Sequence, residues 1–151
     1  MSYLLLLHYL AVVVWVGGMF FAHVALRPAI AATLEPPQRL ALMDATLALF
    51  FPWATVAIVV LIVTGFGMIV GMGGFRAVGA PIHAMAGIGL VMALIFVELR
   101  LGSFRRLRAA VAAKAWPDAG AALGAVRQRV TINLVLGLVT IATAVVGRGG
   151  L

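Results

Sequence analysis

The sequence predicts an all-α membrane protein, an up-down-up-down bundle of four transmembrane helices. Three observations lead to this fold class. Of the 151 residues, 65% are hydrophobic and only 10% are charged, whereas a soluble domain is about 25% charged. The mean hydropathy is +1.20. The apolar stretches are long and continuous rather than alternating, which favours helices over a β-barrel as the structure that satisfies the backbone in lipid.

The apolar stretches predict one domain, residues 1–151, with spans at about 3–26, 51–72, 81–99 and 130–146. A chain of this length is typical of one domain. No Lys or Arg precedes the first apolar run, and the run is too long for the core of a signal peptide. We therefore expect the first span to remain in the mature protein.

The connections between the spans carry helix signals of their own. Residues 35–49 mix prolines and charges with Leu and Ala, which indicates either a short interfacial helix or an extension of span two. Pro52 and Pro81 are expected in the first turns of spans two and three, where the missing N–H costs little. The helical pattern continues past span three to Lys114, and Trp116-Pro117-Asp118 marks a helix end and restart. This predicts a protruding cytoplasmic hairpin between helices three and four.

Positive charge is concentrated in two of the connections. Nine of the eleven Lys and Arg residues lie between spans one and two or between spans three and four: Arg27, Arg39, Arg100, Arg105, Arg106, Arg108, Lys114, Arg127 and Arg129. The other side holds Arg76 and Arg148. Because short Lys/Arg-rich loops stay in the cytoplasm, we expect an inner (plasma) membrane protein with both termini on the periplasmic side. Topology and anionic membrane lipid then explain the net charge of +7, rather than nucleic acid.

Two histidines stand out among the few polar residues of the spans. Cysteine is absent, so thiolate sites are excluded and Met is the only soft ligand. His8 and His83 lie near the outer ends of spans one and three, at depths that agree within roughly one turn. These spans are diagonal in the bundle, so both imidazoles are expected to reach inward to one copper or iron ion. The alternative is that each is a hydrogen-bonded core or interfacial residue.

Methionines are the next candidate ligands, because thioether sulfur suits Cu(I). Met68 and Met72 lie one turn apart at the outer end of span two, close in depth to the two histidines. Met19 lies on the same face of span one as the first histidine. The same spacings also fit ordinary packing. Met85 and Met92 are near 200° and 180° from the histidine of span three, so we expect them to face away from it.

A second polar pair is expected at the cytoplasmic end of the bundle. His23 and Glu98 each stand fifteen residues after the outer histidine of their own span. They are therefore expected to close the same interior. The pair is either a proton or ion relay, or a structural pair with Arg27 or Arg100 that fixes the helix register.

The polar residues of span four are expected to bond a neighbouring helix or their own backbone: Asn133, Thr140 and Thr143. The sequence holds no serine–histidine–acid set, phosphate loop or zinc spacing. This favours a binding or transport protein over an enzyme.

A set of motifs runs along the chain: His8, Trp15-Val16-Gly17-Gly18-Met19-Phe20, Leu26-Arg27-Pro28, Pro36-Pro37-Gln38-Arg39, Phe51-Pro52-Trp53, His83 and Trp116-Pro117. Together they resemble the copper resistance protein D (CopD) family, in its short form that consists of the four-helix domain alone. The resemblance covers nearly the whole chain. It implies an inner-membrane protein with a role in copper uptake or handling.

The His-x6-Trp-x-Gly pattern is also similar, more distantly, to the HemJ-type protoporphyrinogen oxidases, which are four-helix haem proteins. Those pair a His of span one with a His-x-x-Lys or His-x-Lys segment of span three. Here that segment is His83-Ala84-Met85-Ala86, without the Lys. This resemblance implies haem b held by His8 and His83 as an alternative, without protoporphyrinogen oxidation.

Three hypotheses follow for the function. In the first, the protein binds or transports copper received from a periplasmic donor. In the second, it is a b-type haem redox protein that exchanges electrons with quinone. In the third, it is a structural or assembly protein without metal, and the Arg-rich hairpin between spans three and four is its working surface. Lone four-helix bundles often form homodimers, but no single face of this sequence demands one.

Overall fold

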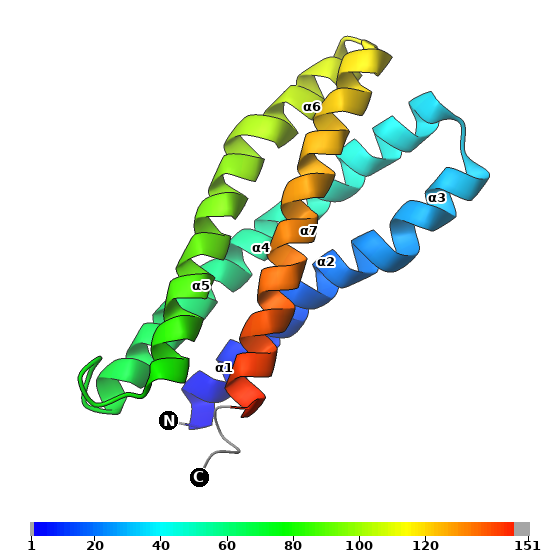
Figure 1. The fold of residues 1–151 in the computed structure, drawn as a ribbon. Coiled ribbons are helices and arrows are strands. Elements are labelled where there is room, and N and C mark those ends of the chain that lie inside the picture. Colours follow the sequence, from blue (N-terminus) through cyan, green and yellow to red (C-terminus); the bar gives the residue numbers. More distant parts are fainter. Residues whose placement is uncertain (1, 147–151) are drawn as a thin grey trace.

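The computed structural model describes residues 2–146, and it confirms the predicted all-α membrane fold (Figure 1). Its four helical spans are Ser2–Thr33, Pro36–Gly71, Ala80–Ala112 and Trp116–Val146. They contain 31 to 36 residues and are therefore about 47–54 Å long. The hydrocarbon core of a bilayer is only about 30 Å thick, so each helix can cross it and also project from it.

Two of the four spans are interrupted by π-helical turns. Span one consists of α1 (Ser2–Val12), η1 (Val13–Gly17), α2 (Gly18–Phe21), η2 (Ala22–Leu26) and α3 (Arg27–Thr33). Span two is the single helix α4 (Pro36–Gly71), and span four is the single helix α7 (Trp116–Val146). Span three consists of α5 (Ala80–Glu98), η3 (Leu99–Ser103) and α6 (Phe104–Ala112).

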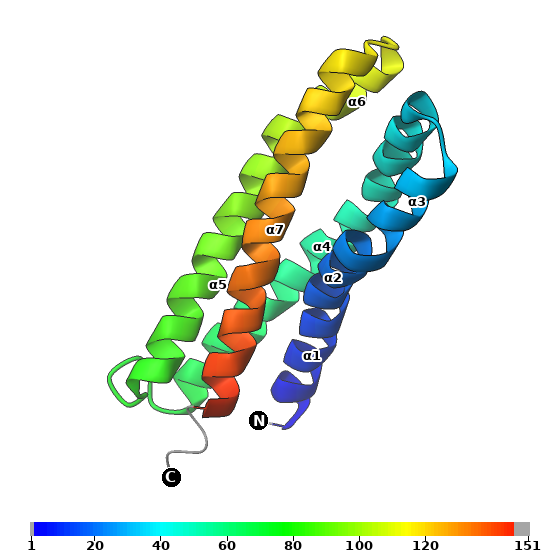
Figure 2. The same ribbon diagram turned by 45° about the vertical axis from the view of Figure 1, so that its right-hand side comes forward.

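The spans form two antiparallel hairpins. α1 packs along α4, and α5 and α6 pack along α7. Figures 1 and 2 show the start of α1, the loop after α4 and the end of α7 at one end of the molecule. We call this the terminal end, made of residues 2–8, 68–85 and 140–146. The opposite end, made of residues 23–45 and 98–131, carries most of the Lys and Arg residues, and we call it the arginine end.

The segment 35–49 is an extension of span two, which decides between the two predicted alternatives. The helix begins at Pro36, behind a capping box in which Glu35 and Gln38 bond each other's backbone N–H groups. Pro52 is therefore inside α4, and its predicted place in a first turn is wrong. Pro81 does lie in the first turn of α5. Both hairpins extend at the arginine end (Figure 1), so the extension is not restricted to helices three and four.

Aromatic rings hold the two hairpins together at mid-height. Phe51 of α4 contacts Phe96 and Phe104 of span three, with ring centroids 5.5 Å and 4.7 Å away. Trp15 of span one meets Phe96 edge-to-face at 6.3 Å. Because lipid tails are as apolar as these side chains, close packing rather than water exclusion stabilises helix association in a membrane. Edge-to-face contacts are a favourable way to pack aromatic rings.

Two glycines allow the closest helix approaches. A Cβ atom on Gly18 would lie 2.4 Å from the Phe50 ring, and one on Gly137 would lie 3.1 Å from Val16. A Cβ atom on the neighbouring Gly17 would meet nothing within 4 Å. Of the two adjacent glycines of span one, Gly18 is therefore the one that the packing requires.

Candidate functional site

Span one presents one line of side chains to the bundle. Ala11, Trp15 and Met19 are buried, and His23 and Arg27 are partly buried, so the line repeats every four residues. We call it the inner stripe. In an α-helix a four-residue repeat drifts by about 40° per step, because a turn takes 3.6 residues. The π turns η1 and η2 are wider, and they take up this drift over the length of the stripe.

His8 lies one turn before the inner stripe and is held by a buried hydroxyl. Its Nδ1 is 2.8 Å from Oγ1 of Thr64, which is 3% exposed. Oγ1 of Thr64 is also 2.6 Å from the carbonyl oxygen of Val60. A carbonyl oxygen only accepts, so the Thr64 hydroxyl donates there, and Nδ1–H of His8 donates to Thr64. In the neutral imidazole the lone pair is then on Nε2, and the ring is oriented as in many metal-binding histidines.

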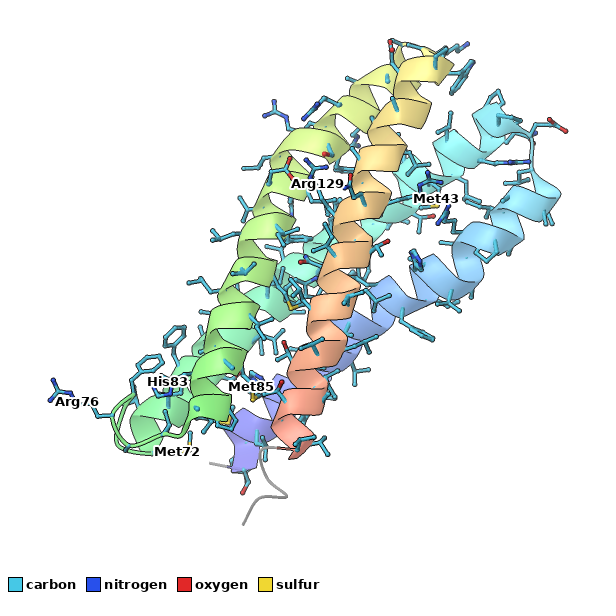
Figure 3. All side chains as sticks on the ribbon, viewed as in Figure 1. Met43, Met72, Arg76, His83, Met85 and Arg129 are labelled. Carbon is cyan, nitrogen blue, oxygen red and sulfur yellow. The ribbon has the colours of Figure 1, made fainter. Side chains whose placement is uncertain are left out.

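His83 has the same tautomer in a different place. Its Nδ1 is 3.0 Å from the carbonyl oxygen of Gly79, so Nδ1–H donates and Nε2 carries the lone pair of the neutral ring. The residue is exposed, and its ring lies 5.7 Å from the ring of Phe75 in the loop before α5. Figure 3 shows His83 and Met85 on opposite sides of α5, with Met85 on the side of α7. His83 therefore points away from the bundle instead of inward.

The two histidines also differ in depth. Spans one and three run in the same direction and touch where Trp15 meets Phe96. Seven residues before each ring, His8 is level with Gly89, and His83 lies six residues further toward the terminal end. That is about 9 Å, more than the single turn expected. The structure thus does not assemble His8 and His83 into one pair for a metal ion or a haem iron.

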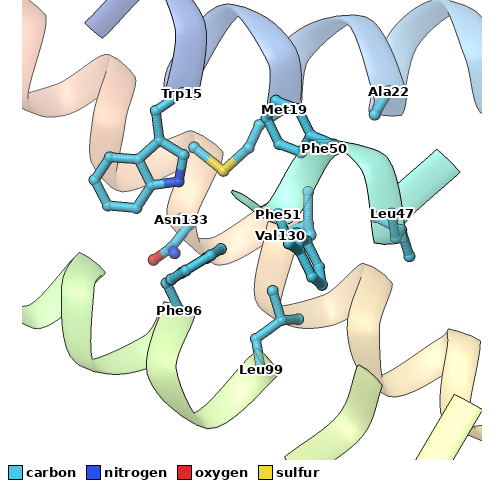
Figure 4. Close-up of a pocket in the computed structure, with 10 residues that line it drawn as sticks. All are labelled: Trp15, Met19, Ala22, Leu47, Phe50, Phe51, Phe96, Leu99, Val130 and Asn133. Atoms are coloured by element: carbon cyan, nitrogen blue, oxygen red, sulfur yellow. The ribbon is translucent and has the colours of Figure 1, made fainter. Parts of the chain in front are cut away.

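Met19 borders a small cavity at the centre of the bundle. The cavity has a volume of about 30 Å³ and lies between Trp15, Met19, Asn133 and a wall of aromatic and aliphatic side chains (Figure 4). Asn133 donates from Nδ2 to the carbonyl oxygen of Met92 at 3.1 Å, which confirms the expected bond to a neighbouring helix. Its buried Oδ1 has no hydrogen-bond partner within residues 2–146. Met19 and Asn133 thus line a mostly apolar space of about one water molecule.

Three further methionines, Met68, Met72 and Met85, lie at the terminal end. Met68 lies one turn beyond Thr64 on α4 and is partly buried, whereas Met72 caps the end of α4 and is exposed. Met85 is partly buried on the inner side of α5, as Figure 3 shows. The sequence indicated that Met85 faces away from His83. It could not show that this direction is the interior, because the rotation of α5 is set by its loop.

At the arginine end the structure does not bring His23 and Glu98 together. Nδ1 of His23 lies 3.5 Å from Oγ1 of Thr131 on α7. Glu98 forms a salt bridge with Arg129 of α7 instead. A guanidinium on the adjacent helix can form a charge-assisted hydrogen bond with the carboxylate, which is stronger than a neutral one.

The remaining polar groups of the spans bond locally. Arg100 lies in the π turn η3 and donates to Thr55 on α4, not to Glu98. Thr140 and Thr143 donate to carbonyl oxygens of their own helix, each at 2.8 Å, as predicted. Within residues 2–146, no three or more His, Cys, Asp and Glu side chains are placed to hold a metal ion. A metal site in this part of the chain would therefore contain at most two of these side chains and would need methionine, hydroxyl or backbone ligands to complete it.

Comparisons with known proteins agree with the helical architecture. The family model described as copper resistance protein D (CopD) matches residues 44–147, which include α4 from residue 44 onward and all of α5, α6 and α7. Neither the curated proteins nor the solved structures give a match to the chain. The family match covers more than half of the 151 residues, and four helices within residues 2–146 are long and apolar enough to cross a membrane. The protein is therefore a multi-pass membrane protein that belongs to the CopD family.

Proposed function

We propose that this protein binds Cu(I) within the inner membrane and transfers it along span one. Membership of a family described by copper resistance supports copper as the substrate. The observation that carries the proposal is the hydrogen bond that Nδ1–H of the His8 imidazole donates to the buried hydroxyl of Thr64. The lone pair of Nε2 is then free for a metal, and a fixed ring orientation strengthens such a ligand.

The inner stripe supplies further groups that suit a soft cation. Met19 follows His8 by eleven residues, about 16 Å along the helix, and His23 follows Met19 by four residues, about 6 Å. Thioether and imidazole groups both bind Cu(I). The ring of Trp15 lies between His8 and Met19, and an indole face attracts cations. The stripe thus offers successive weak sites, which favour passage over tight retention.

Methionines at the terminal end complete the proposed entry. Met68, Met72 and Met85 lie there, on α4 and α5, and we propose that they pass copper from a periplasmic donor to His8. The arginine end holds nine of the eleven Lys and Arg residues, which favours a cytoplasmic position for that end and a periplasmic position for both termini. Because the chain has no cysteine, single cysteines at Gly74 and Lys114 test this directly. An impermeant maleimide added to intact cells should label Gly74→Cys and not Lys114→Cys.

The copper proposal is tested by titrating the detergent-purified protein with Cu(I) against a chromogenic competitor chelator. We expect wild type to take Cu(I) from the chelator. His8→Ala should lose affinity by on the order of 100-fold, since removing a ligand costs at least as much as removing the group that orients it. His83→Ala is the matched control, because it removes an imidazole at the same end of the molecule that points outward.

Three results would overturn the proposal. The first is equal Cu(I) affinity in wild type and His8→Ala. The second is a loss in His83→Ala as large as that in His8→Ala, which would require a shared site. The third is a Soret band that sharpens on reduction in protein expressed with ample haem, because this would identify a haem protein.

A further inference from the structure

A groove of about 440 Å³ opens at the arginine end, away from the histidines and the inner stripe. Arg39 and Leu40 line it from the start of α4, and Trp116, Leu123 and Arg127 line it from the first turns of α7. Figures 1 and 2 both place these two helix starts at the same end of the molecule. The groove therefore lies between the two hairpins, where each contributes one arginine.

The two arginines leave positive charge in the groove. Nε of Arg39 donates to the carbonyl oxygen of Leu34, which holds the guanidinium in place, while its terminal nitrogens have no partner within residues 2–146. Arg127 is exposed and forms no salt bridge in the same part of the chain. No acidic side chain lines the groove. The nearby Glu35 accepts a backbone N–H in the capping box of α4, so the arginines are free to bind an anion.

The rest of the groove is apolar. Leu40, Leu123 and Trp116 form its walls together with two prolines. Tryptophan is enriched where a membrane protein meets the headgroups. The helices are about 47–54 Å long, slightly longer than the roughly 40–45 Å of a bilayer with its headgroups. The arginine end therefore reaches the level of the lipid phosphates.

We propose that this groove binds the phosphate headgroup of an anionic phospholipid. Arg39 and Arg127 bind the phosphate oxygens from opposite walls, since guanidinium groups match phosphate geometry. Trp116 and the two leucines contact the glycerol and the first acyl carbons. The charge and the apolar walls together fit an amphiphile bound at the membrane surface. The inference does not depend on copper binding.

The test measures thermal unfolding of the detergent-purified protein during titration with three probes: dioctanoyl phosphatidylglycerol, dioctanoyl phosphatidylcholine and inorganic phosphate. We expect a saturable rise in Tm with phosphatidylglycerol. A basic residue near an anionic membrane surface contributes about fivefold in affinity. Arg39→Gln/Arg127→Gln should therefore weaken phosphatidylglycerol by roughly 30-fold. The matched control is Arg105→Gln/Arg106→Gln, which removes two exposed arginines of the same end that do not line the groove.

Arg39→Lys/Arg127→Lys separates charge from folding, because it keeps both charges and should retain most of the phosphatidylglycerol response. Equal responses in wild type and Arg39→Gln/Arg127→Gln would overturn the proposal. So would equal weakening in the control pair, which would indicate a diffuse electrostatic effect. A rise in Tm with inorganic phosphate as large as that with phosphatidylglycerol would identify a soluble anion as the ligand, and an equal response to phosphatidylcholine would remove the role of the arginines.

Discussion

His8 and His83 are both histidines near the same end of the molecule, and in each ring Nδ1 is hydrogen-bonded to an oxygen. Their surroundings differ. His8 is partly buried in the middle of a packed helix pair and bonds Thr64 of another span. His83 is exposed in the first turn of α5 and bonds the backbone of Gly79, only four residues earlier in the sequence. One ring is oriented by tertiary structure, and the other by local structure.

This difference teaches which of the two can form a selective site. A ring held from another helix keeps its direction only while the helices are packed, so a ligand at Nε2 is coupled to the fold. A ring held by its own first turn keeps its direction without the bundle. It presents Nε2 to the surroundings of the protein rather than to ligands on other spans.

Of the changes that test this comparison, removing the Thr64 hydroxyl that orients the His8 ring should have the largest effect on Cu(I) affinity. Thr64→Val keeps the shape of the side chain and removes the acceptor for Nδ1–H of His8. We expect Cu(I) affinity to fall by about 10–100-fold, the usual cost of losing a partner that orients a metal ligand. Thr64→Ser should restore most of it. Phe75→Leu alters a contact of the exposed His83 instead. It is the control, and it should leave the Cu(I) affinity unchanged. Equal effects of Thr64→Val and Phe75→Leu would end the distinction between the two rings.

The two glycines of span one allow the same comparison for helix packing, because Gly18 lies on the packed face of the helix and Gly17 on the open face. Gly18→Ala places a Cβ atom against the Phe50 ring, and we expect it to destabilise the protein by about 1–3 kcal/mol. Gly17→Ala meets open space and should be neutral or stabilising by up to about 1 kcal/mol, because Ala is the better helix former. Unfolding titrations in mixed detergent measure both. If Gly17→Ala were the more harmful change, the assigned inner face of span one would be wrong.

Much of this architecture follows from the sequence, and the exceptions have physical reasons. The four spans, the restart at Trp116 and the local bonds of Thr140 and Thr143 follow from hydropathy, proline positions and the polar groups of a single helix. These are properties of local segments. The sequence left open whether residues 35–49 extend span two, because its apolar run begins later. The capping pair of Glu35 and Gln38 is the signal that locates the helix start at Pro36.

Counting 100° per residue along one span does not show how that helix is rotated about its axis relative to the rest of the bundle. The diagonal placement of spans one and three predicted that His83 faces inward, but His83 is exposed and its ring lies against Phe75 of the loop before α5. Counting 100° per residue paired His23 with Glu98, although the carboxylate forms its salt bridge with Arg129 on α7. The π turns that keep Met19 in the inner stripe depend on packing against other spans, and no residue of η1 or η2 predicts a π turn from the sequence.

The salt bridge between Glu98 and Arg129 provides a smaller test, at the arginine end. The side chains are 48% and 28% exposed, so we expect Glu98→Gln to cost no more than about 1 kcal/mol in stability. Copper transport into vesicles should continue at a rate close to that of wild type, whereas a relay through Glu98 would be strongly impaired by the loss of its charge. Arg129→Gln is the control for the pair, and the two variants should resemble each other.

The smallest effect is expected at His83 itself. His83→Gln removes the imidazole and its contact with Phe75 while keeping a polar side chain at the exposed position. Surface substitutions usually change stability by no more than about 0.5 kcal/mol, so we expect an unchanged unfolding midpoint and a change in Cu(I) affinity below about threefold. A large loss of affinity at an unchanged midpoint would mean that α5 turns when copper binds and brings His83 to the same ion as His8. The comparison would then describe two states of one site, and a cross-link between the two positions, made in the cysteine-free chain with cysteines in place of both histidines, would show whether the rings approach each other.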